Sequence, residues 1–184
     1  MSRINLEADS LLYPMPVLII GTFDEDGIPC AMNAAWGMIS DFKEVSISLG
    51  EHKTTDNLKK NPDFTVSLGT EDTVKACDYV GIVSGRDVPD KFEKAGFHAE
   101  KSEKVNAPLI KELPFALECR MKSFENGILV GEILGLSADE SILKDGKIDL
   151  SAMRPIAYDP FGNTYTGLGE TVGHAFHDGT ELGA

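Results

Sequence analysis

The first third of the chain alternates apolar and polar residues with a period of two, which is the pattern of half-buried β-strands. Residues 45–49 read Val-Ser-Ile-Ser-Leu, and residues 64–68 read Phe-Thr-Val-Ser-Leu. A leading strand is expected over residues 13–22, which contain two prolines, and an Asp-Glu-Asp-Gly turn follows at residues 24–27. The pattern therefore predicts that the chain begins as a β-sheet.

The middle of the chain changes to a helical pattern before the strands return. Residues 70–73 have the composition of a helix cap, and helical spacing continues as far as Gly81. A second short helix is expected to start after Pro89 and to end at Gly96. Strands are expected over residues 115–122 and 127–136, joined by an Asn-Gly turn. Strands joined by hairpins around a helical insertion predict a mainly β, α+β domain: an antiparallel barrel, not a parallel doubly wound sheet.

Residues 52–57, His-Lys-Thr-Thr-Asp-Asn, open a short helix that Asn61-Pro62 ends about two turns later. A helix N-terminus presents unpaired N–H groups and a partial positive charge. Thr54 and Thr55 add hydroxyl groups, and Lys53 adds a full positive charge, so the segment is typical of a phosphate site. The alternative left open is that Thr54 is only an N-cap and Lys53 is solvated.

Length and charge narrow the classes of function. A chain of 184 residues predicts one domain over residues 1–184. The formal net charge of −13 disfavours nucleic acid or an anionic membrane as partner, because both bind concentrated basic surfaces. No membrane-spanning run and no signal peptide are recognised, and the three cysteines form no C-x-x-C pair. A cytoplasmic location is therefore expected.

The last part of the chain is expected to divide into a docked stretch and a disordered tail. The aromatic content of residues 158–169 predicts that this stretch folds back against the barrel, with a turn supplied by Asp159-Pro160-Phe161-Gly162-Asn163. Residues 174–184 are expected to be disordered. His174 and His177 could suggest a metal site, but metal sites need further ligands on a fixed scaffold, so no metal is predicted.

The order of these pieces resembles the flavin reductase-like, flavoredoxin-type family of FMN-binding split barrels. The resemblance extends from about Tyr13 to about Gly173, and it is carried by the ordered set of segments because no single motif is specific. Beyond the segments already named, it includes Ser84-Gly85-Arg86-Asp87, Asp90-Lys91-Phe92, Ala107-Pro108-Leu109-Ile110, Leu117-Glu118-Cys119-Arg120, Pro155-Ile156-Ala157-Tyr158-Asp159, Tyr165 and Leu168-Gly169-Glu170. It implies a split β-barrel with a helical insertion and short helices.

The resemblance also implies where the flavin ring lies. Asn33, Ala34 and Ala35 would run along the isoalloxazine ring, since small residues let a ring approach the backbone N–H and C=O groups that can bond its polar atoms. Trp36, the only tryptophan, is expected first to be a core anchor, with contact to the ring as a compatible alternative. No catalytic residue is assigned, because the reactivity belongs to the flavin.

The same resemblance implies that Lys53, Thr54 and Thr55 meet the FMN phosphate. His52 could donate a hydrogen bond near this site, or it could be a solvated loop residue. Asn57 could bind the cofactor, or it could lie on the surface of the helix.

The implied function is that of an FMN-binding oxidoreductase, a homodimer that takes electrons from NADH or NADPH and passes them to free flavin or another acceptor. The alternatives are a flavoredoxin-like electron carrier serving a redox protein, and a non-redox flavin-binding module. Residues 40–44 stand where many relatives carry a Pro-Pro or similar pair, so this loop is expected to differ in shape. No Arg cluster marks a site for the 2′-phosphate of NADPH, which leaves the nicotinamide unassigned.

Overall fold

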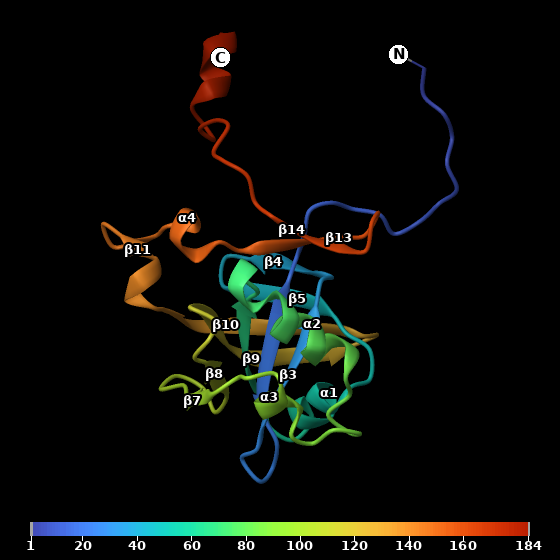
Figure 1. Ribbon diagram of the computed structural model, residues 1–184, viewed down its shortest axis with the longest axis vertical. Helices are drawn as coiled ribbons and strands as arrows, with labels where there is room; N and C mark the ends of the chain where they lie inside the picture. Colours follow the sequence, from blue (N-terminus) through green and yellow to red (C-terminus); the bar gives the residue numbers. More distant parts are fainter. Residues whose placement is uncertain (1, 184) are drawn as a thin grey trace.

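A curled antiparallel sheet of seven strands forms the body of the molecule (Figure 1). The computed structural model describes residues 2–183. The strand order is β3-β2-β6-β9-β10-β5-β4, so β3 and β4 are the two edge strands. The bounds are β2 (Leu18–Phe23), β3 (Pro29–Ala34), β4 (Gly37–Asp41), β5 (Glu44–Ser48), β6 (Asp63–Leu68), β9 (Phe115–Glu125) and β10 (Ile128–Ala138). The predicted β-rich fold is confirmed.

The start of the sheet differs in two places from the prediction. The leading strand is two strands, β1 (Met15–Pro16) and β2, which pair with different partners. Proline has no N–H to donate to a ladder, so Pro14 and Pro16 favour a short strand at an edge. Residues 40–44, expected as a loop, are instead the end of β4 and a tight connection into β5. Their shape is therefore that of a hairpin.

A second, three-stranded sheet holds the C-terminal part of the chain against the first. β1 pairs with β13 (Ile156–Asp159), and β13 pairs with β14 (Thr164–Gly167). Tyr158 and Tyr165 pack against the core, which confirms the predicted docking of this stretch, although Phe161 in the turn is exposed.

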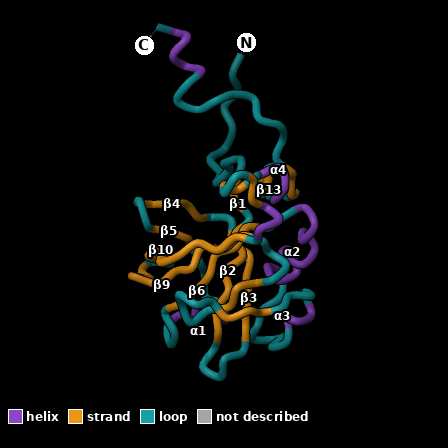
Figure 2. The backbone as a smooth tube through the Cα atoms, turned by 90° about the vertical axis from the view of Figure 1, so that its left-hand side faces the viewer, coloured by secondary structure: helices purple, strands orange, loops and turns teal. Residues whose placement is uncertain are grey.

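Both ends of the chain extend away from the sheets (Figures 1 and 2). Residues 168–183 are exposed and contain a single 3-10 turn, η3 (Asp178–Leu182). The expected disorder of residues 174–184 stays a prediction, and residue 184 lies outside the described range.

The helical insertion lies between β6 and β9 and covers one side of the sheet (Figure 2). The helices predicted in the insertion are confirmed as η1 (Glu71–Thr73), which leads into α2 (Val74–Ile82), and α3 (Lys91–Lys94). The helix predicted before β6 is confirmed as α1 (Lys53–Leu58). Smaller elements are β7 (Ala99–Lys101), β8 (Pro108–Ile110), η2 (Glu140–Ile142), β11 (Leu143–Lys144), β12 (Lys147–Ile148) and α4 (Leu150–Met153). Among residues 2–183, no helix combines the length and apolar character that a bilayer span requires.

Strand β2 separates two hydrophobic cores. Leu18 and Ile20 face the inside of the curled sheet, where they pack around the fully buried Phe64. Ile19 faces the opposite side and packs with α2 and α3, where Phe92 is buried. A strand buried on both faces needs apolar residues at consecutive positions, which explains the run Leu18-Ile19-Ile20. The position of β2 fixes its neighbour β3 next to the helices.

An ion pair between the buried Asp63 and the exposed Arg120 links two central strands of the sheet. Asp63 on β6 lies opposite Arg120 on β9, and its carboxylate accepts hydrogen bonds from Arg120 Nε at 2.7 Å and from the Asn106 N–H at 2.7 Å. Burial raises the pKa of Asp63, but the hydrogen bonds from Arg120 and Asn106 outweigh it and lower the pKa below the ordinary value of 3.8. The pKa of Asp63 is lower in the folded than in the unfolded protein, so the ionised carboxylate stabilises the fold at pH values above the unfolded-state pKa. This stabilisation is lost as the pH falls through the folded-state pKa.

We expect Asp63→Asn to lower the free energy of unfolding by about 1.5–3 kcal/mol at neutral pH, because it removes a charged hydrogen-bond acceptor. The difference in the free energy of unfolding between Asp63→Asn and wild type should shrink as the pH falls below 3.8, the ordinary pKa of an aspartate. Urea denaturation at pH 7 and pH 3 measures both effects, with the exposed Glu103→Gln as the control. An equal difference at both pH values would assign the effect to packing instead of charge.

Candidate functional site

Two adjacent cavities form a groove between the outer edge of β3, the start of α1 and one face of α2. The first, called here the wide cavity, has a volume of about 430 Å³ and is lined by Met32, Asn33, Ala34, Ala35, Trp36, Ser48, Leu49, Gly50, His52, Asp78, Gly81, Ile82, Tyr158 and Tyr165. The second, called the narrow cavity, has a volume of about 220 Å³ and is lined by Met32, Asn33, His52, Lys53, Thr54, Val80, Gly81, Ile82, Val83, Ser84, Gly85 and Lys91. Because five residues line both, one elongated ligand can occupy the two together.

The position of β3 at the end of the sheet explains why a groove forms here. Only one side of β3 is paired in the sheet, so backbone N–H and C=O groups on its outer side are available for other partners. Helix α2 packs close to this free edge because Gly81 has no side chain. A Cβ atom placed at Gly81 would lie 3.0 Å from the Cβ atom of Asn33.

A hydrogen-bonded network forms the polar wall of the wide cavity. Asn33 Nδ2 donates to the carbonyl oxygen of Cys77 at 3.1 Å and to the Tyr165 hydroxyl oxygen at 3.3 Å. The Tyr165 hydroxyl in turn donates to Asp78 Oδ1 at 2.9 Å. Burial and the neighbouring Asp78 raise the pKa of Tyr165 to about 12, so this phenol stays a donor at neutral pH. The network ties β3, α2 and β14 together around the cavity.

Trp36 is not a core residue, and the first expectation for it is wrong. Its exposed fraction is 53%, and its ring lines the wide cavity 6.5 Å from the ring of Tyr158. Trp36 lies where the chain leaves the β3 edge and begins the β4 edge, and at this junction the neighbouring Ala35 takes the buried position. Contact between Trp36 and a bound ring stays a prediction.

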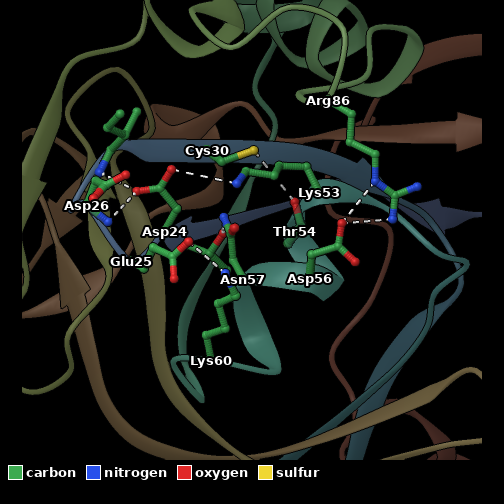
Figure 3. Close-up of polar contacts among 12 residues, drawn as sticks. Asp24, Glu25, Asp26, Cys30, Lys53, Thr54, Asp56, Asn57, Lys60 and Arg86 are labelled. Atoms are coloured by element: carbon green, nitrogen blue, oxygen red, sulfur yellow. Dashed lines mark hydrogen bonds and ion pairs between the residues drawn. The ribbon is translucent and has the colours of Figure 1, made fainter.

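Lys53 and Thr54 both line the narrow cavity. Their contact with a phosphate stays a prediction. The Thr54 side chain is buried, with its hydroxyl oxygen 3.9 Å from the sulfur of Cys30. Lys53 Nζ lies 3.7 Å from Asp24 Oδ2 (Figure 3), so a carboxylate already compensates part of its charge. His52 is exposed and lines both cavities.

Thr55 and Asn57 lie beneath the groove and line neither cavity. The Thr55 hydroxyl accepts a hydrogen bond from the His52 N–H at 2.9 Å and donates one to the His52 carbonyl at 2.8 Å. Asn57 Nδ2 donates to Thr22 Oγ1 at 3.0 Å, and only 2% of Asn57 is exposed, so the alternative of a helix-surface residue is wrong. Thr55 therefore caps the start of α1, and Asn57 ties α1 to β2 under the groove.

The structure adds residues that sequence reasoning did not place in the site. Ser84 and Gly85 form a wall of the narrow cavity, and the next residue, Arg86, pairs with Asp56 of α1 at 2.8 Å (Figure 3). This ion pair fastens the segment after α2 to α1. Lys91 reaches the same cavity from α3. The sequence analysis had singled out the segments that contain these residues. No spacing in the sequence indicated that the segment after α2 contacts α1.

The groove offers binding groups, with no activated thiol among them. Cys30, Cys77 and Cys119 are free and buried, and burial raises the pKa of each thiol. Within residues 2–183, no three potential metal-ligating side chains gather in one place.

Comparison with known proteins agrees with the fold. Residues 10–159 match the family model of the flavin reductase like domain. Flavoredoxin of Desulfovibrio vulgaris (Miyazaki F) has 33% sequence identity and a TM-score of 0.92, with 97% of this chain and 100% of that chain covered. Flavoredoxin from Methanosarcina acetivorans has 28% sequence identity and a TM-score of 0.90, with 99% of this chain and 100% of that chain covered.

A relative of Archaeoglobus fulgidus, an uncharacterized protein, is 32% identical over 162 residues, which are 84% of this chain and 89% of the relative. Together, these matches confirm the family resemblance and the split-barrel fold that were expected from the sequence.

Gly81→Ala tests whether the close approach of α2 to β3 shapes the site. The added methyl group must displace Asn33 or α2 by a few tenths of an ångström, while alanine's helix propensity offsets up to about 1 kcal/mol of the strain. The family implies a flavin ligand, and we expect the flavin affinity of the groove to fall by roughly tenfold, equivalent to about 1.4 kcal/mol. Flavin fluorescence titration measures this affinity, and Gly179→Ala, where a Cβ meets nothing within 4 Å, is the control. Unchanged affinity in Gly81→Ala would contradict this role.

Proposed function

The chain belongs to the flavin reductase-like family, and on that premise we propose that it binds FMN, with the ring in the wide cavity and the phosphate in the narrow cavity. The observation that carries the proposal is the chemical difference between the two adjoining cavities. The wide cavity combines aromatic rings with a free strand edge, whereas the narrow cavity combines lysines with hydroxyl groups. FMN has the same division between a flat ring and an anionic end.

In the wide cavity, the β3 edge would bind the polar rim of the ring. Asn33, Ala34 and Ala35 bring the backbone close to the ligand, because none has a side chain that fills the cavity. Trp36 and Tyr158 add apolar and aromatic surface to the same cavity. These groups would orient the ring and exclude water from one of its faces.

In the narrow cavity, Lys53, Thr54 and His52 would bind the phosphate. Lysine is a point charge suited to phosphate, and a hydroxyl group adds a hydrogen bond. Thr55 and Asn57 would support the site through their bonds to His52 and Thr22, without touching the ligand.

We propose that the protein is an oxidoreductase that uses NADH or NADPH and passes electrons to free flavin or another acceptor. When bound, the flavin supplies the redox chemistry, and the protein's residues bind, orient and shield it. A flavoredoxin-like electron carrier is the second candidate. It is supported by the two flavoredoxin structures and by the net charge of −13, which suits a basic redox partner. The three buried free thiols support a cytoplasmic location.

Anaerobic stopped-flow absorption on the FMN-loaded protein tests the function. Rapid bleaching of the flavin absorbance by NADH or NADPH is the expected result for a reductase. Bleaching only by a reduced redox protein would assign the electron carrier, and bleaching by neither would assign a non-redox binding module. The absorption spectrum of freshly purified protein should already show flavin bands, and if it takes up no FMN on titration, the proposed function fails.

We also propose a homodimer with the flavin site near the interface. Four of the five residues of the edge strand β4 are exposed, and Met38 and Ile39 are 66% and 57% exposed. Beside them lies a cavity of about 370 Å³ with a mainly apolar lining that reaches Trp36. A second copy would cover this edge and complete the groove.

Light scattering at micromolar concentration should therefore give twice the mass of the chain. Met38→Glu should shift the protein towards the monomer and weaken FMN binding, because a buried carboxylate at the interface is unfavourable. A monomeric wild type that binds FMN tightly would contradict an interfacial site.

A further inference from the structure

Asp78 places a carboxylate in the lining of the wide cavity. It lies on α2, one helical turn before Ile82 of the same cavity, and it is half-buried. Its Oδ1 atom accepts a hydrogen bond from the Tyr165 hydroxyl at 2.9 Å. Among residues 2–183, no other group donates a hydrogen bond to this carboxylate, and no lysine, arginine or histidine forms an ion pair with it. Asp78 therefore brings an uncompensated negative charge to the cavity.

The position of this carboxylate is fixed by the wall around it. Tyr165, which donates to Asp78 from β14, also accepts a hydrogen bond from Asn33 of β3 at 3.3 Å. The ring of Tyr165 lies 6.1 Å from the ring of Tyr158, another residue of the cavity lining. Because three elements hold this wall together, the charge of Asp78 stays at one place in the cavity.

The other titratable groups around the wide cavity supply no positive charge in mildly alkaline solution. They are His52, Tyr158 and Tyr165, and no lysine or arginine is found among the described residues that line this cavity. A phenol is uncharged at neutral pH, and a histidine loses its charge as the pH rises above neutral. The lysines of the groove, Lys53 and Lys91, line the narrow cavity instead.

The carboxylates at the other end of the groove differ from Asp78 in this respect. Asp24 lies 3.7 Å from Lys53, and Asp56 lies 2.8 Å from Arg86 (Figure 3). A cation therefore compensates each of these two carboxylates before any ligand binds. The charge of Asp78 has no such partner in the described chain, so it acts in full on a ligand in the wide cavity.

A carboxylate at this place affects oxidised and reduced flavin differently. The oxidised ring is neutral. Its reduction takes up two electrons, with two protons to give a neutral ring or with one proton to give an anion. A bound ring excludes water from the cavity, so repulsion between like charges is weakly screened there. The carboxylate of Asp78 therefore opposes the anionic reduced ring and has little effect on the oxidised ring.

We infer that Asp78 lowers the reduction potential of the bound flavin, so that the site holds the oxidised ring more tightly than the reduced ring. This inference rests on the proposed flavin site and assigns within it the residue that tunes the cofactor. Potential and relative affinity are linked: tenfold weaker binding of the reduced ring lowers the potential of a two-electron couple by about 30 mV. A flavin bound in this way passes its electrons more readily to an acceptor.

A role for Asp78 in positioning alone predicts a different outcome. In that case the carboxylate would only hold Tyr165, and through it Asn33, in the wall of the cavity. Its substitution would then weaken the binding of oxidised and reduced flavin equally, and the reduction potential would not change. Tyr165→Phe would have the same effect as the substitution of Asp78, because it breaks the same hydrogen bond.

The test compares Asp78→Asn, which keeps an acceptor for Tyr165, with Asp145→Asn, which removes the same charge from the exposed turn between β11 and β12. Spectroelectrochemical titration of the FMN-loaded protein at about pH 8.5, where histidines are uncharged, gives the potential. We expect Asp78→Asn to raise the affinity for reduced relative to oxidised flavin by roughly 10- to 100-fold, which is about 30–60 mV. Asp145→Asn and Tyr165→Phe should change this ratio by less than about twofold.

An unchanged potential in Asp78→Asn would overturn the inference. An equal rise in Tyr165→Phe would also overturn it, because the effect would then belong to the hydrogen-bonded wall and not to the charge. If Asp78→Asn does not hold flavin, the wild-type protein decides: its potential should lie below that of free FMN at the same pH, and a value at or above that of free FMN would contradict the inference. If wild type takes up no FMN, the proposed function itself is wrong, and the inference fails with it.

Discussion

The close contact between α2 and the free edge of β3 is the constraint on which the groove depends. Gly81 allows the contact, and Asn33 fastens it through its hydrogen bonds to Cys77 and Tyr165. If α2 were further from β3, the strand edge would be open to solvent and the polar wall of the wide cavity would come apart. The contact in turn depends on β2, since a strand buried on both faces holds β3 at the boundary between the two cores.

The cations around the narrow cavity differ in whether a carboxylate of the chain lies beside them. In a chain with net charge −13, Arg86 and Lys53 are each beside an aspartate, and these pairs fasten the segments around α1 (Figure 3). Lys91 alone among the three cations at this end of the groove is both buried and without a carboxylate in the described chain. Exposed ion pairs contribute little free energy, whereas a buried charge exerts a strong field on its surroundings.

Local patterns in the sequence were reliable where one residue's environment follows from its neighbours. Alternation in β5 correctly predicted that Val45 and Ile47 are buried, and the Asn-Gly pair correctly predicted the turn between β9 and β10. The same reasoning failed for Trp36. Size and hydrophobicity favour burial for tryptophan, but Trp36 lies at a junction between two sheet edges, and its environment is set by strands distant in sequence.

The sequence by itself determined the β-rich fold, the family and the segment that contributes Lys53 and Thr54 to the groove. Each of these depends on periodicity, on turn residues or on the order of motifs along the chain. Only the tertiary structure decided that Asn57 lies beneath the groove and that Tyr165 closes its wall. It also decided that Lys91 reaches the same cavity as Lys53 from a separate helix. The reason is physical: burial and the absence of a counter-ion result from contacts between distant segments, and no local pattern records them.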